Sequence, residues 1–262
     1  MLIRSWNLFH GNSVPPQRAE FLDEMVELAT ADDPDVLCLQ ELPAWALGRF
    51  TAGDLAARPR IGPLPIPAEL GHRVTELNNG LLRSAFSGQG NGIQVSPRLR
   101  VLAHETLTLN ARRFRGAQSR ALKLGLVERL AWAKERRIVQ ALRLADPSGR
   151  TFFVTNMHCT SSPSDERLPD AELLRAAWFA VSKAAPEDVV VLAGDFNVRA
   201  AQSRTLRDLI GPEWGFSAPG PGIDHILVRG ATAGPLRIWP DEQRLDGDRL
   251  LSDHAPVELE LT

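Results

Sequence analysis

Residues 189–197 read VVVLAGDFN. Five apolar residues in a row, three of them β-branched, predict a short strand that is covered on both faces of a sheet. A glycine at position 194 permits a sharp turn at the end of this strand, after which Asp195 and Asn197 point the same way. An Asx-type turn that caps a helix explains the same residues equally well. Alone, the stretch predicts a buried strand with a polar end.

The overall composition bounds the class of protein. The chain has 262 residues, 44% of them hydrophobic and 24% charged, which is ordinary for a globular protein with a sizeable core. Its formal net charge of −2 gives no argument for a nucleic-acid binder. No apolar run approaches the roughly 18 residues of a membrane span, and no signal-peptide pattern is apparent. Because no repeat or linker divides the chain, we expect one domain over residues 1–262.

Two cysteines, Cys38 and Cys159, each lie in or beside an apolar run. A disulfide between them is conceivable, but buried free thiols are the better expectation for such positions. Free thiols are typical of reducing compartments, so we expect the protein in the cytoplasm. We also expect a monomer.

Strand and helix patterns alternate along the chain. Apolar residues recur at helical spacing between residues 21 and 29 and again between 171 and 184. Residues 43–92 are rich in Pro, Gly and Arg, which is typical of a loop with one short helix at 44–50. The sequence DPSG at 146–149 predicts a hairpin turn. Apolar runs predict strands at 2–8, 36–39, 93–95, 99–107, 138–144, 151–157, 189–193, 223–228 and 256–261. Two mixed sheets packed face to face, with helices outside, would shield these strands from water.

Three further strands end in a polar residue, namely Asn7, Glu41 and His158. Hard divalent cations such as Mg²⁺ favour oxygen ligands and keep several waters, so one or two carboxylates such as Glu41 suffice. A glutamate stabilised by the dipole at the start of a helix is the plainer interpretation. A histidine at a strand end is more often structural than catalytic. Asn7 either terminates its strand, or orients a carboxylate or binds a phosphoryl oxygen.

Asp224 and His225 interrupt an apolar run that would not ordinarily carry two polar residues. A carboxylate inside a strand needs a partner, because an isolated buried charge is costly. We predict His254 as that partner, since an aspartate that accepts from one imidazole nitrogen leaves the other free for proton transfer. His225 is interpreted as an outward-facing strand residue without a catalytic role.

Taken together, these polar strand ends resemble the endonuclease/exonuclease/phosphatase superfamily, whose fold is DNase I-like. The matching stretches occur in the family's order and span nearly the whole chain: 5–7 (SWN), 39–41 (LQE), 156–158 (NMH), 194–197 (GDFN), 223–226 (IDHI) and 252–256 (SDHAP). The resemblance implies an α/β fold, a four-layer α/β/β/α sandwich of two mixed sheets with the site at one edge. It also implies Mg²⁺-dependent cleavage of phosphate esters.

The same resemblance implies a metal site. Glu41 resembles the principal metal ligand, with Asn7 beside it and Asp253 in or next to the metal shell. Mg²⁺ is the expected ion, and Mn²⁺ is a workable substitute.

The resemblance also implies roles in proton transfer. Asp224 resembles the carboxylate that orients His254. Asp195, Asn197 and His158 resemble the groups that handle the attacking water, the phosphoryl oxygens and the leaving group. Both His254 and Asp195 are candidates for the general base.

Two departures from better-known branches limit the choice of substrate. The chain has no tyrosine, so branches with a tyrosine in the site match poorly. Exonuclease III-type enzymes continue the first motif with glycine, leucine and arginine, whereas residues 8–12 of this chain read LFHGN.

A basic segment suggests a polyanionic substrate. Residues 98–150 hold thirteen Lys or Arg and four Asp or Glu, a local charge of +9, while the remainder of the chain carries −11. We predict that Arg112, Arg113 and Arg115 bind a phosphate backbone. Phe114 and Trp132 either stack on bases or belong to the core. The competing interpretation is a solvated helix at 117–137 whose inward face is formed by Leu122, Leu126, Leu130 and Ala133.

These inferences favour a Mg²⁺-dependent phosphodiesterase, an endo- or exonuclease acting on DNA or RNA. The first alternative is a phosphatase or a phospholipid phosphodiesterase of the same fold, although a lack of exposed apolar loops argues against a lipid. The second alternative is a non-catalytic binding protein on the same scaffold. It is disfavoured because every expected polar position is filled.

Overall fold

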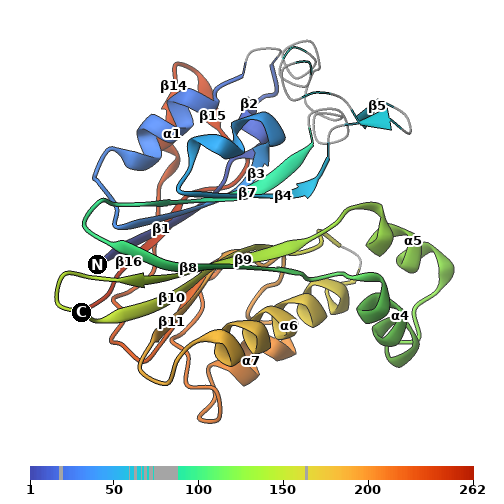
Figure 1. Cartoon of the computed structure of the whole chain (residues 1–262). Helices are drawn as coiled ribbons and strands as arrows, with labels where there is room; N and C mark the ends of the chain where they lie inside the picture. The colour runs from blue at the N-terminus through green and yellow to red at the C-terminus, as the bar shows by residue number, and fades with distance from the viewer. Residues whose placement is uncertain are drawn as a thin grey trace. The chain divides into compact units, whose positions relative to one another are not determined.

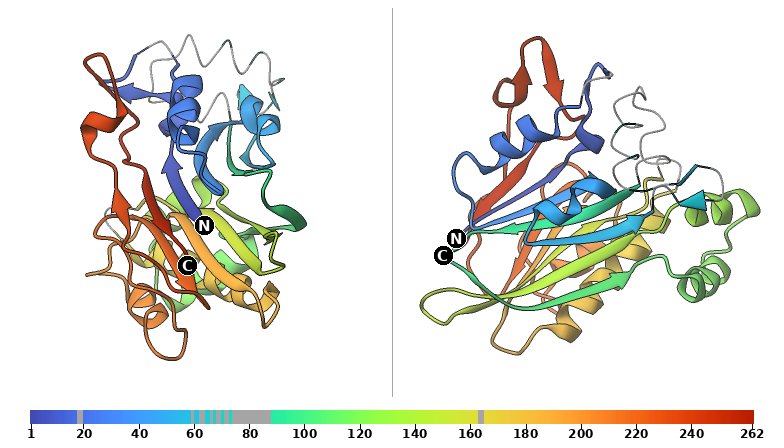
Figure 2. Two further views of the ribbon diagram at one scale, coloured as in Figure 1. Left: turned by 90° about the vertical axis from the view of Figure 1, so that its left-hand side faces the viewer. Right: turned by 45° about the horizontal axis from the view of Figure 1, so that its top comes forward.

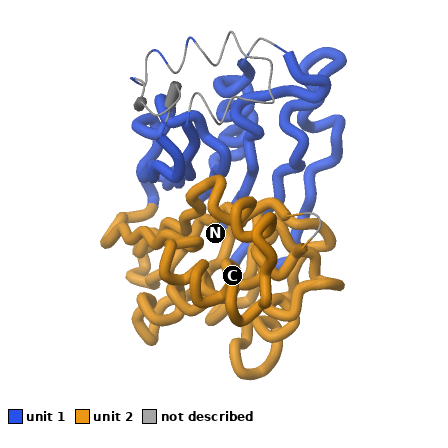
Figure 3. The backbone as a smooth tube through the Cα atoms, turned by 90° about the vertical axis from the view of Figure 1, so that its right-hand side faces the viewer, with its two compact units in different colours: residues 1–98, 234–261 blue, residues 99–233, 262 orange. Residues whose placement is uncertain are grey.

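The computed structural model describes residues 1–17, 20–58, 60–61, 64–65, 67, 70, 73, 88–162 and 165–262. The chain divides into two units (Figure 3). Unit 1 comprises Met1–Arg98 and Gly234–Leu261, and unit 2 comprises Leu99–Ala233 together with Thr262. Unit 1 therefore combines the N-terminal part of the sequence with residues 234–261, and the ammonium group of Met1 donates to the carbonyl of Leu261 at 2.8 Å.

Unit 1 is built on a six-stranded mixed sheet in the order β13-β16-β1-β3-β7-β4 (Figure 1). Its central strands, β1 (Leu2–Asn7) and β3 (Val36–Pro43), are parallel, and the other neighbours are antiparallel. Helix α1 (Leu22–Thr30) lies between these two strands in sequence and buries Leu22, Met25 and Ala29 at helical spacing. The remaining strands of this sheet are β4 (Ala52–Ala57), β7 (Gln89–Val95), β13 (Arg237–Ile238) and β16 (Val257–Glu260).

Smaller elements complete unit 1. Strand β2 (Ser13–Val14) pairs with β15 (Arg249–Leu251), so the last hairpin of the unit lies beside the segment that follows β1 (Figure 2). This pairing brings residues 249–251, near the C-terminus of the chain, to the segment that directly follows β1. The other short elements are η1 (Phe9–Gly11), η2 (Ala44–Arg49), β5 (Arg60–Ile61), β6 (Leu64–Pro65), η3 (Asp241–Arg244) and β14 (Leu245–Asp246).

Unit 2 contains a five-stranded mixed sheet in the order β12-β11-β10-β9-β8. As in unit 1, a single parallel pair, β10 (Thr151–His158) with β11 (Val189–Asp195), is flanked by antiparallel neighbours. Helix α6 (Arg167–Lys183) connects the parallel pair, as a parallel crossover requires. The other elements are β8 (Arg100–Thr108), α4 (Arg112–Ala121), α5 (Leu126–Lys134), β9 (Ile138–Ala145), α7 (Arg204–Leu209) and β12 (Asp224–Arg229).

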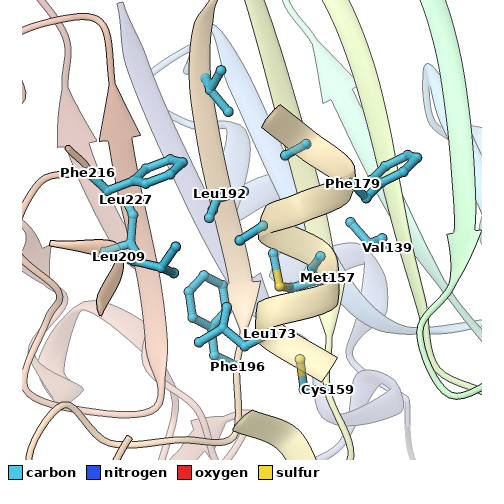
Figure 4. Packing of buried hydrophobic residues seen from close by; sticks show 14 of the residues in the cluster. Val139, Met157, Cys159, Leu173, Phe179, Leu192, Phe196, Leu209, Phe216 and Leu227 are labelled. Atoms are coloured by element: carbon cyan, nitrogen blue, oxygen red, sulfur yellow. The ribbon is translucent and has the colours of Figure 1, made fainter. Parts of the chain in front are cut away.

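The core of unit 2 lies between its sheet and α6 (Figure 4). Leu173 on the helix and Met157, Leu192 and Phe196 on or after the strands are all buried. Full burial of such a side chain contributes about 1.5–3 kcal/mol. This packing fixes β10 and β11 against one helix and so fixes the positions at which both strands end.

Most sequence-based expectations are confirmed. The α/β class with two mixed sheets is present, the turn at 146–149 joins β9 to β10, and Cys38 and Cys159 are buried free thiols. The expected loop at 43–92 is wrong in part, because β4 and the start of β7 fall inside it. Much of the rest of that loop lies outside the described residues. None of the described helices is long and apolar enough to cross a membrane.

The expected single helix at 117–137 is replaced by two helices, α4 and α5. Trp132 sets the orientation of α5, because its indole is fully buried and donates to Glu172 on α6 at 2.5 Å. As a result Leu126, Val127 and Leu130 are 72%, 77% and 62% exposed. The inward face with Leu126 and Leu130, which the competing interpretation of a solvated helix required, is therefore wrong.

A buried ion-pair network ties the edge of the unit 1 sheet together. The guanidinium of Arg4 is fully buried and donates to Glu258 at 2.7 Å and to the carbonyl of Ala29 at 2.6 Å. Glu258 also accepts from the indole of Trp239 at 2.9 Å and from Arg237. Burial raises the pKa of Glu258, but hydrogen bonds from Trp239, Arg237 and Arg4 outweigh it and lower the pKa below 4.5.

We expect Arg4→Met to lower the free energy of unfolding by about 3 kcal/mol. Removing one partner leaves the other charge buried, and Arg237 only partly compensates. Because the pKa of Glu258 is lowered by folding, its contribution is present above pH 4.5 and is lost as the pH falls through the folded-state pKa. Urea denaturation at pH 7 and pH 3.5 measures both effects. A loss that does not shrink at the lower pH would contradict this account.

Candidate active site

The first group of candidate residues lies at the carboxyl ends of β1 and β3. Because these strands are parallel neighbours, Asn7 pairs with Gln40, and Glu41 follows directly. Asn7 is buried, and its Oδ1 accepts the backbone N–H of Phe9 at 3.0 Å. The sheet thus brings Asn7 and Glu41 to adjacent strand ends.

Glu41 sits in a β-bulge. Between the pairs Leu39–Gly92 and Leu42–Gly90, β3 advances by one residue more than β7. Glu41 adopts a left-handed backbone conformation with φ of 54°, which is unusual for a residue other than glycine, asparagine or aspartate. Such strain clusters at functional sites, where the surrounding structure compensates for it. Its carboxylate is half-buried, and Oε2 lies 3.0 Å from Nε2 of His10.

The last motif of the chain is attached to the end of β1 by Ser252. This buried serine has a φ of 63°, and its hydroxyl donates to the carbonyl of Asn7 at 2.6 Å. The same oxygen accepts the backbone N–H of His254 at 3.1 Å. Ser252 therefore sets the position of Asp253 and His254 relative to Asn7. Asp253 is exposed, and the imidazole of His254 is half-buried.

Arg244 and Trp6 clamp the same turn, and sequence analysis missed both. The buried guanidinium of Arg244 donates to the carbonyls of Leu251, Ser252 and His254 at 3.1, 2.8 and 3.2 Å. The indole of Trp6 donates to the carbonyl of His254 at 2.8 Å. These donors satisfy carbonyls that would otherwise be buried without partners, so they hold the turn in one conformation. Trp6 belongs to the motif SWN at 5–7 beside Asn7, whereas no sequence pattern indicated a role for Arg244.

The second group of candidate residues lies in unit 2. His158 and Asp195 are register partners at the carboxyl ends of the parallel strands β10 and β11, and Asp224 at the start of β12 is the register partner of Asp195. The structure therefore places these three residues in a row on adjacent strands. Asp195 is 1% exposed, and its Oδ2 lies 3.5 Å from Nε2 of His158.

The turn after β11 contains both the sharp turn at Gly194 and the Asx-type turn that the sequence offered as alternatives. Gly194 has a φ of 135°, and a Cβ atom there would lie 2.0 Å from the carbonyl oxygen of Met157, so no other residue fits. The N–H of Asn197 donates to Asp195 Oδ1 at 2.9 Å, which is the Asx-type turn. Asn197 also donates from its amide to the carbonyl of Cys159 at 3.0 Å. Asp195 and Asn197 are thus held in one turn at the end of β10 and β11.

A buried arginine that the sequence did not single out lies against His158. One guanidinium nitrogen of Arg137 is 2.9 Å from Nδ1 of His158, and another donates to Glu135 at 2.7 Å. Arg137 therefore brings a positive charge to the end of β10. Its only signal in the sequence was membership of the basic segment.

Two predicted pairings have different outcomes. His225 is buried against Phe196 and contacts the carbonyl of Val198 at 3.0 Å, so its expected outward orientation is wrong. Burial lowers the pKa of His225. The pairing of Asp224 with His254 joins residues of different units and stays a prediction.

The predicted substrate-binding arginines lie at the start of α4. Arg112 and Arg113 are exposed, whereas Arg115 is half-buried and donates to the carbonyl of Trp132 at 3.1 Å. Trp132 belongs to the core, and Phe114 packs edge-on against it. Of the two alternatives for Trp132, stacking on bases or membership of the core, the structure shows the core.

Solved structures of known proteins share this fold. The chain aligns over 100% of its length with 98% of D. rerio TDP2 complexed with single-strand DNA product, at 15% identity and a TM-score of 0.61. An endonuclease/exonuclease/phosphatase from Bacteroides vulgatus gives 16% identity and a TM-score of 0.61, covering 100% of this chain and 98% of that one. A mannosyl-6-phosphatase from Bacteroides thetaiotaomicron gives 14% identity and a TM-score of 0.57, covering 100% and 99%. No curated protein sequence matches the chain.

The fold is DNase I-like, and the family description that matches this chain covers endonucleases, exonucleases and phosphatases. The family profile for the Endonuclease/Exonuclease/phosphatase family matches residues 5–254. The chain belongs to this family, as the polar strand ends predicted.

Proposed function

We propose that the protein is a divalent-metal-dependent phosphodiesterase and that residues 1–262 act as one catalytic domain. The observation that carries this proposal is Glu41, a carboxylate in a left-handed bulge beside the buried Asn7. Family membership supplies the reaction class, the hydrolysis of phosphate esters. The motifs of both units follow the family's order, so we assign residues from both units to one reaction.

Asn7, Glu41 and Asp253 would hold Mg²⁺ or Mn²⁺. The three side chains offer one amide and two carboxylate oxygens, which suits a hard cation. Ser252 connects the backbones of Asn7 and Asp253, which supports their action as one set. When bound, the ion would neutralise charge on the phosphoryl oxygens during displacement.

The other residues would handle the water and the leaving group. We assign the general base to Asp195 or His254, with Asp224 orienting the imidazole of His254. Asn197 holds the turn that carries Asp195. His158, with the guanidinium of Arg137 against it, would offer donors to the phosphoryl oxygens.

Nucleic acid is the first candidate substrate. The TDP2 structure with single-strand DNA shows that a protein of this fold binds such a polymer. In this chain, the exposed Arg112 and Arg113 belong to a segment with a net charge of +9. A polymer that follows these cations would release counterions on binding.

A phospholipid is the second candidate, and the surface of α5 favours it. Leu126, Val127 and Leu130 form an exposed aliphatic face. Nucleic acids bind aromatic and cationic groups rather than aliphatic side chains, whereas a lipid interface accepts apolar side chains between cations. The exposed cations Lys123, Arg129 and Lys134 lie on or next to the same helix.

One experiment separates these substrates. We expect binding of single-stranded DNA to a Glu41→Gln protein to weaken with salt, by about 0.7 unit of log–log slope per phosphate contact. Replacing Arg112, Arg113 and Arg115 with Ser should flatten the slope by about 1.4 units, the value for two contacts rather than three, because Arg115 is engaged with Trp132. Arg204→Ser, an exposed change on α7, is the matched control.

The second arm uses lipid vesicles. If the substrate is a phospholipid, replacing Leu126, Val127 and Leu130 with Ser should abolish sedimentation with anionic vesicles and leave DNA binding unchanged. A Mg²⁺-supplemented panel of plasmid DNA, single-stranded RNA, sugar phosphates, inositol phosphates and sphingomyelin then identifies the hydrolysed ester. Binding without hydrolysis of any ester would instead support a non-catalytic binding protein. We further propose that the protein is a monomer and that it is cytoplasmic. The two buried free thiols support the cytoplasmic location, because free thiols are typical of reducing compartments.

A further inference from the structure

The segment directly after Asn7 has an unusual backbone. Phe9, His10 and Gly11 have φ angles of 47°, 56° and 76°, three consecutive residues in the left-handed region. This conformation costs about 1–2 kcal/mol for each residue other than glycine, so such runs are rare. These are also the residues at which the sequence departs from the exonuclease III-type pattern.

Specific contacts hold this left-handed turn in place. The N–H of Phe9 donates to Asn7 Oδ1, and the carbonyl of Phe9 accepts from Asn12 at 2.9 Å. The carbonyl of Gly11 accepts from Phe21, at the start of α1, at 2.9 Å. Any other residue at Gly11 would be strained by the positive φ, and its Cβ atom would also lie only 2.9 Å from Cγ of Glu20. The strain is thus balanced by contacts on both sides of the turn.

The consequence of the turn is the position of His10. Its side chain is buried, 6% exposed, and its Nε2 lies 3.0 Å from Oε2 of Glu41. The backbone of Glu41 is itself in the left-handed region, with a φ of 54°. The side chains of two strained residues from different segments are therefore in contact.

From this geometry we infer that His10 is a positioning residue for Glu41, donating from Nε2 to the carboxylate that would ligate the metal. The inference rests on the proposed function. Among the residues that the structure describes, Nδ1 of His10 is buried and has no hydrogen-bond partner. A proton on Nδ1 would be an unsatisfied buried donor, so the geometry favours the tautomer with its proton on Nε2. A neutral donor orients the carboxylate and leaves its negative charge available to a cation, which a Lys or Arg in this place would not do.

Binding of Mn²⁺ to the full-length protein, measured by calorimetry without substrate, tests this role. We expect His10→Ala to weaken Mn²⁺ affinity by about 10–100-fold, the usual effect of removing a group that orients a metal ligand. His10→Gln, whose amide can donate to Glu41, should restore affinity to within a few-fold of wild type. His104→Ala, an exposed histidine of unit 2, is the control and should not change affinity.

Each other outcome has a definite meaning. If His10→Ala binds Mn²⁺ as tightly as wild type, the positioning role is wrong while the proposed function stands. If His10→Gln is folded by circular dichroism and as weak as His10→Ala, the donated hydrogen bond is not what matters and the inference fails. If the wild-type protein itself binds no Mn²⁺, the metal-dependent function fails, and the inference fails with it.

Discussion

His254→Ala and Asp224→Asn are each expected to lower kcat by about 10⁴-fold while the protein stays folded. The magnitude is that of losing a histidine base or the carboxylate that fixes its tautomer. Asp224→Asn keeps the shape of the side chain and removes only its charge. Neither residue belongs to the buried hydrophobic core, so thermal unfolding should be little changed. Steady-state hydrolysis of a small phosphodiester, with circular dichroism on each variant, provides the measurement.

The double variant decides whether the two residues act together. If Asp224 works through His254, the loss in the double variant should be close to that of the more damaged single variant, because groups that act as a unit are not additive. Asp208→Asn, an exposed aspartate of α7, should not change kcat and should add nothing to His254→Ala. Losses that multiply to about 10⁸-fold would show that the two residues act independently and would contradict the role of Asp224 in orienting His254.

Glu41→Gln is expected to lower kcat/KM by about 10³-fold. The metal's stabilisation of transition-state charge is worth several kcal/mol, at 1.36 kcal/mol for each tenfold change. Glutamine has nearly the same volume and retains an oxygen, so the bulge should persist and only the charge is lost. Excess Mn²⁺ should recover part of the activity, since the other oxygen donors remain.

The control for this variant is Glu27→Gln, an exposed position on α1 of the same unit. It should leave both kcat/KM and Mn²⁺ affinity unchanged. Equal activity of Glu41→Gln and wild type at limiting metal would exclude Glu41 as a ligand. The strained conformation at Glu41 would then need another explanation.

Periodicity predicted the central strands well because they are apolar on both faces. Residues 189–193 and 36–39 contain no polar residue. They form the first part of β11 and β3, which are parallel to β10 and β1 respectively. The structure extends both strands by residues 194–195 and 40–43, the polar ends that hold the candidate chemistry. An extension of this kind depends on pairing with a neighbouring strand, which no local pattern records.

The region of α4 and α5 was predicted least well, for a physical reason. Counting leucines at helical spacing assumes that the leucines face the core. In the structure, Trp132 and its acceptor Glu172 determine which face is buried, and one fully buried indole outweighs three exposed aliphatic side chains. Glu172 lies forty residues further along the chain, so a local pattern could not identify this contact.

The candidate residues were found because their chemistry is visible in single letters, whereas the residues that hold them were not. Asn7, Glu41 and Asp195 stand out as polar ends of apolar runs. Arg244 acts only through backbone carbonyls, and the role of His10 arises from the left-handed turn that presents it to Glu41. At Arg244 and His10, neither the carbonyl contacts nor the backbone conformation has a signature in the sequence.

The measurement that tests metal-dependent hydrolysis most directly is add-back of metal to protein stripped with EDTA. With a small phosphodiester as substrate, activity should fall to background after chelation and should return on addition of Mg²⁺ or Mn²⁺ in excess of the chelator. The oxygen donors of Asn7, Glu41 and Asp253 predict this preference for hard cations. Full hydrolytic activity that persists in excess EDTA would contradict it.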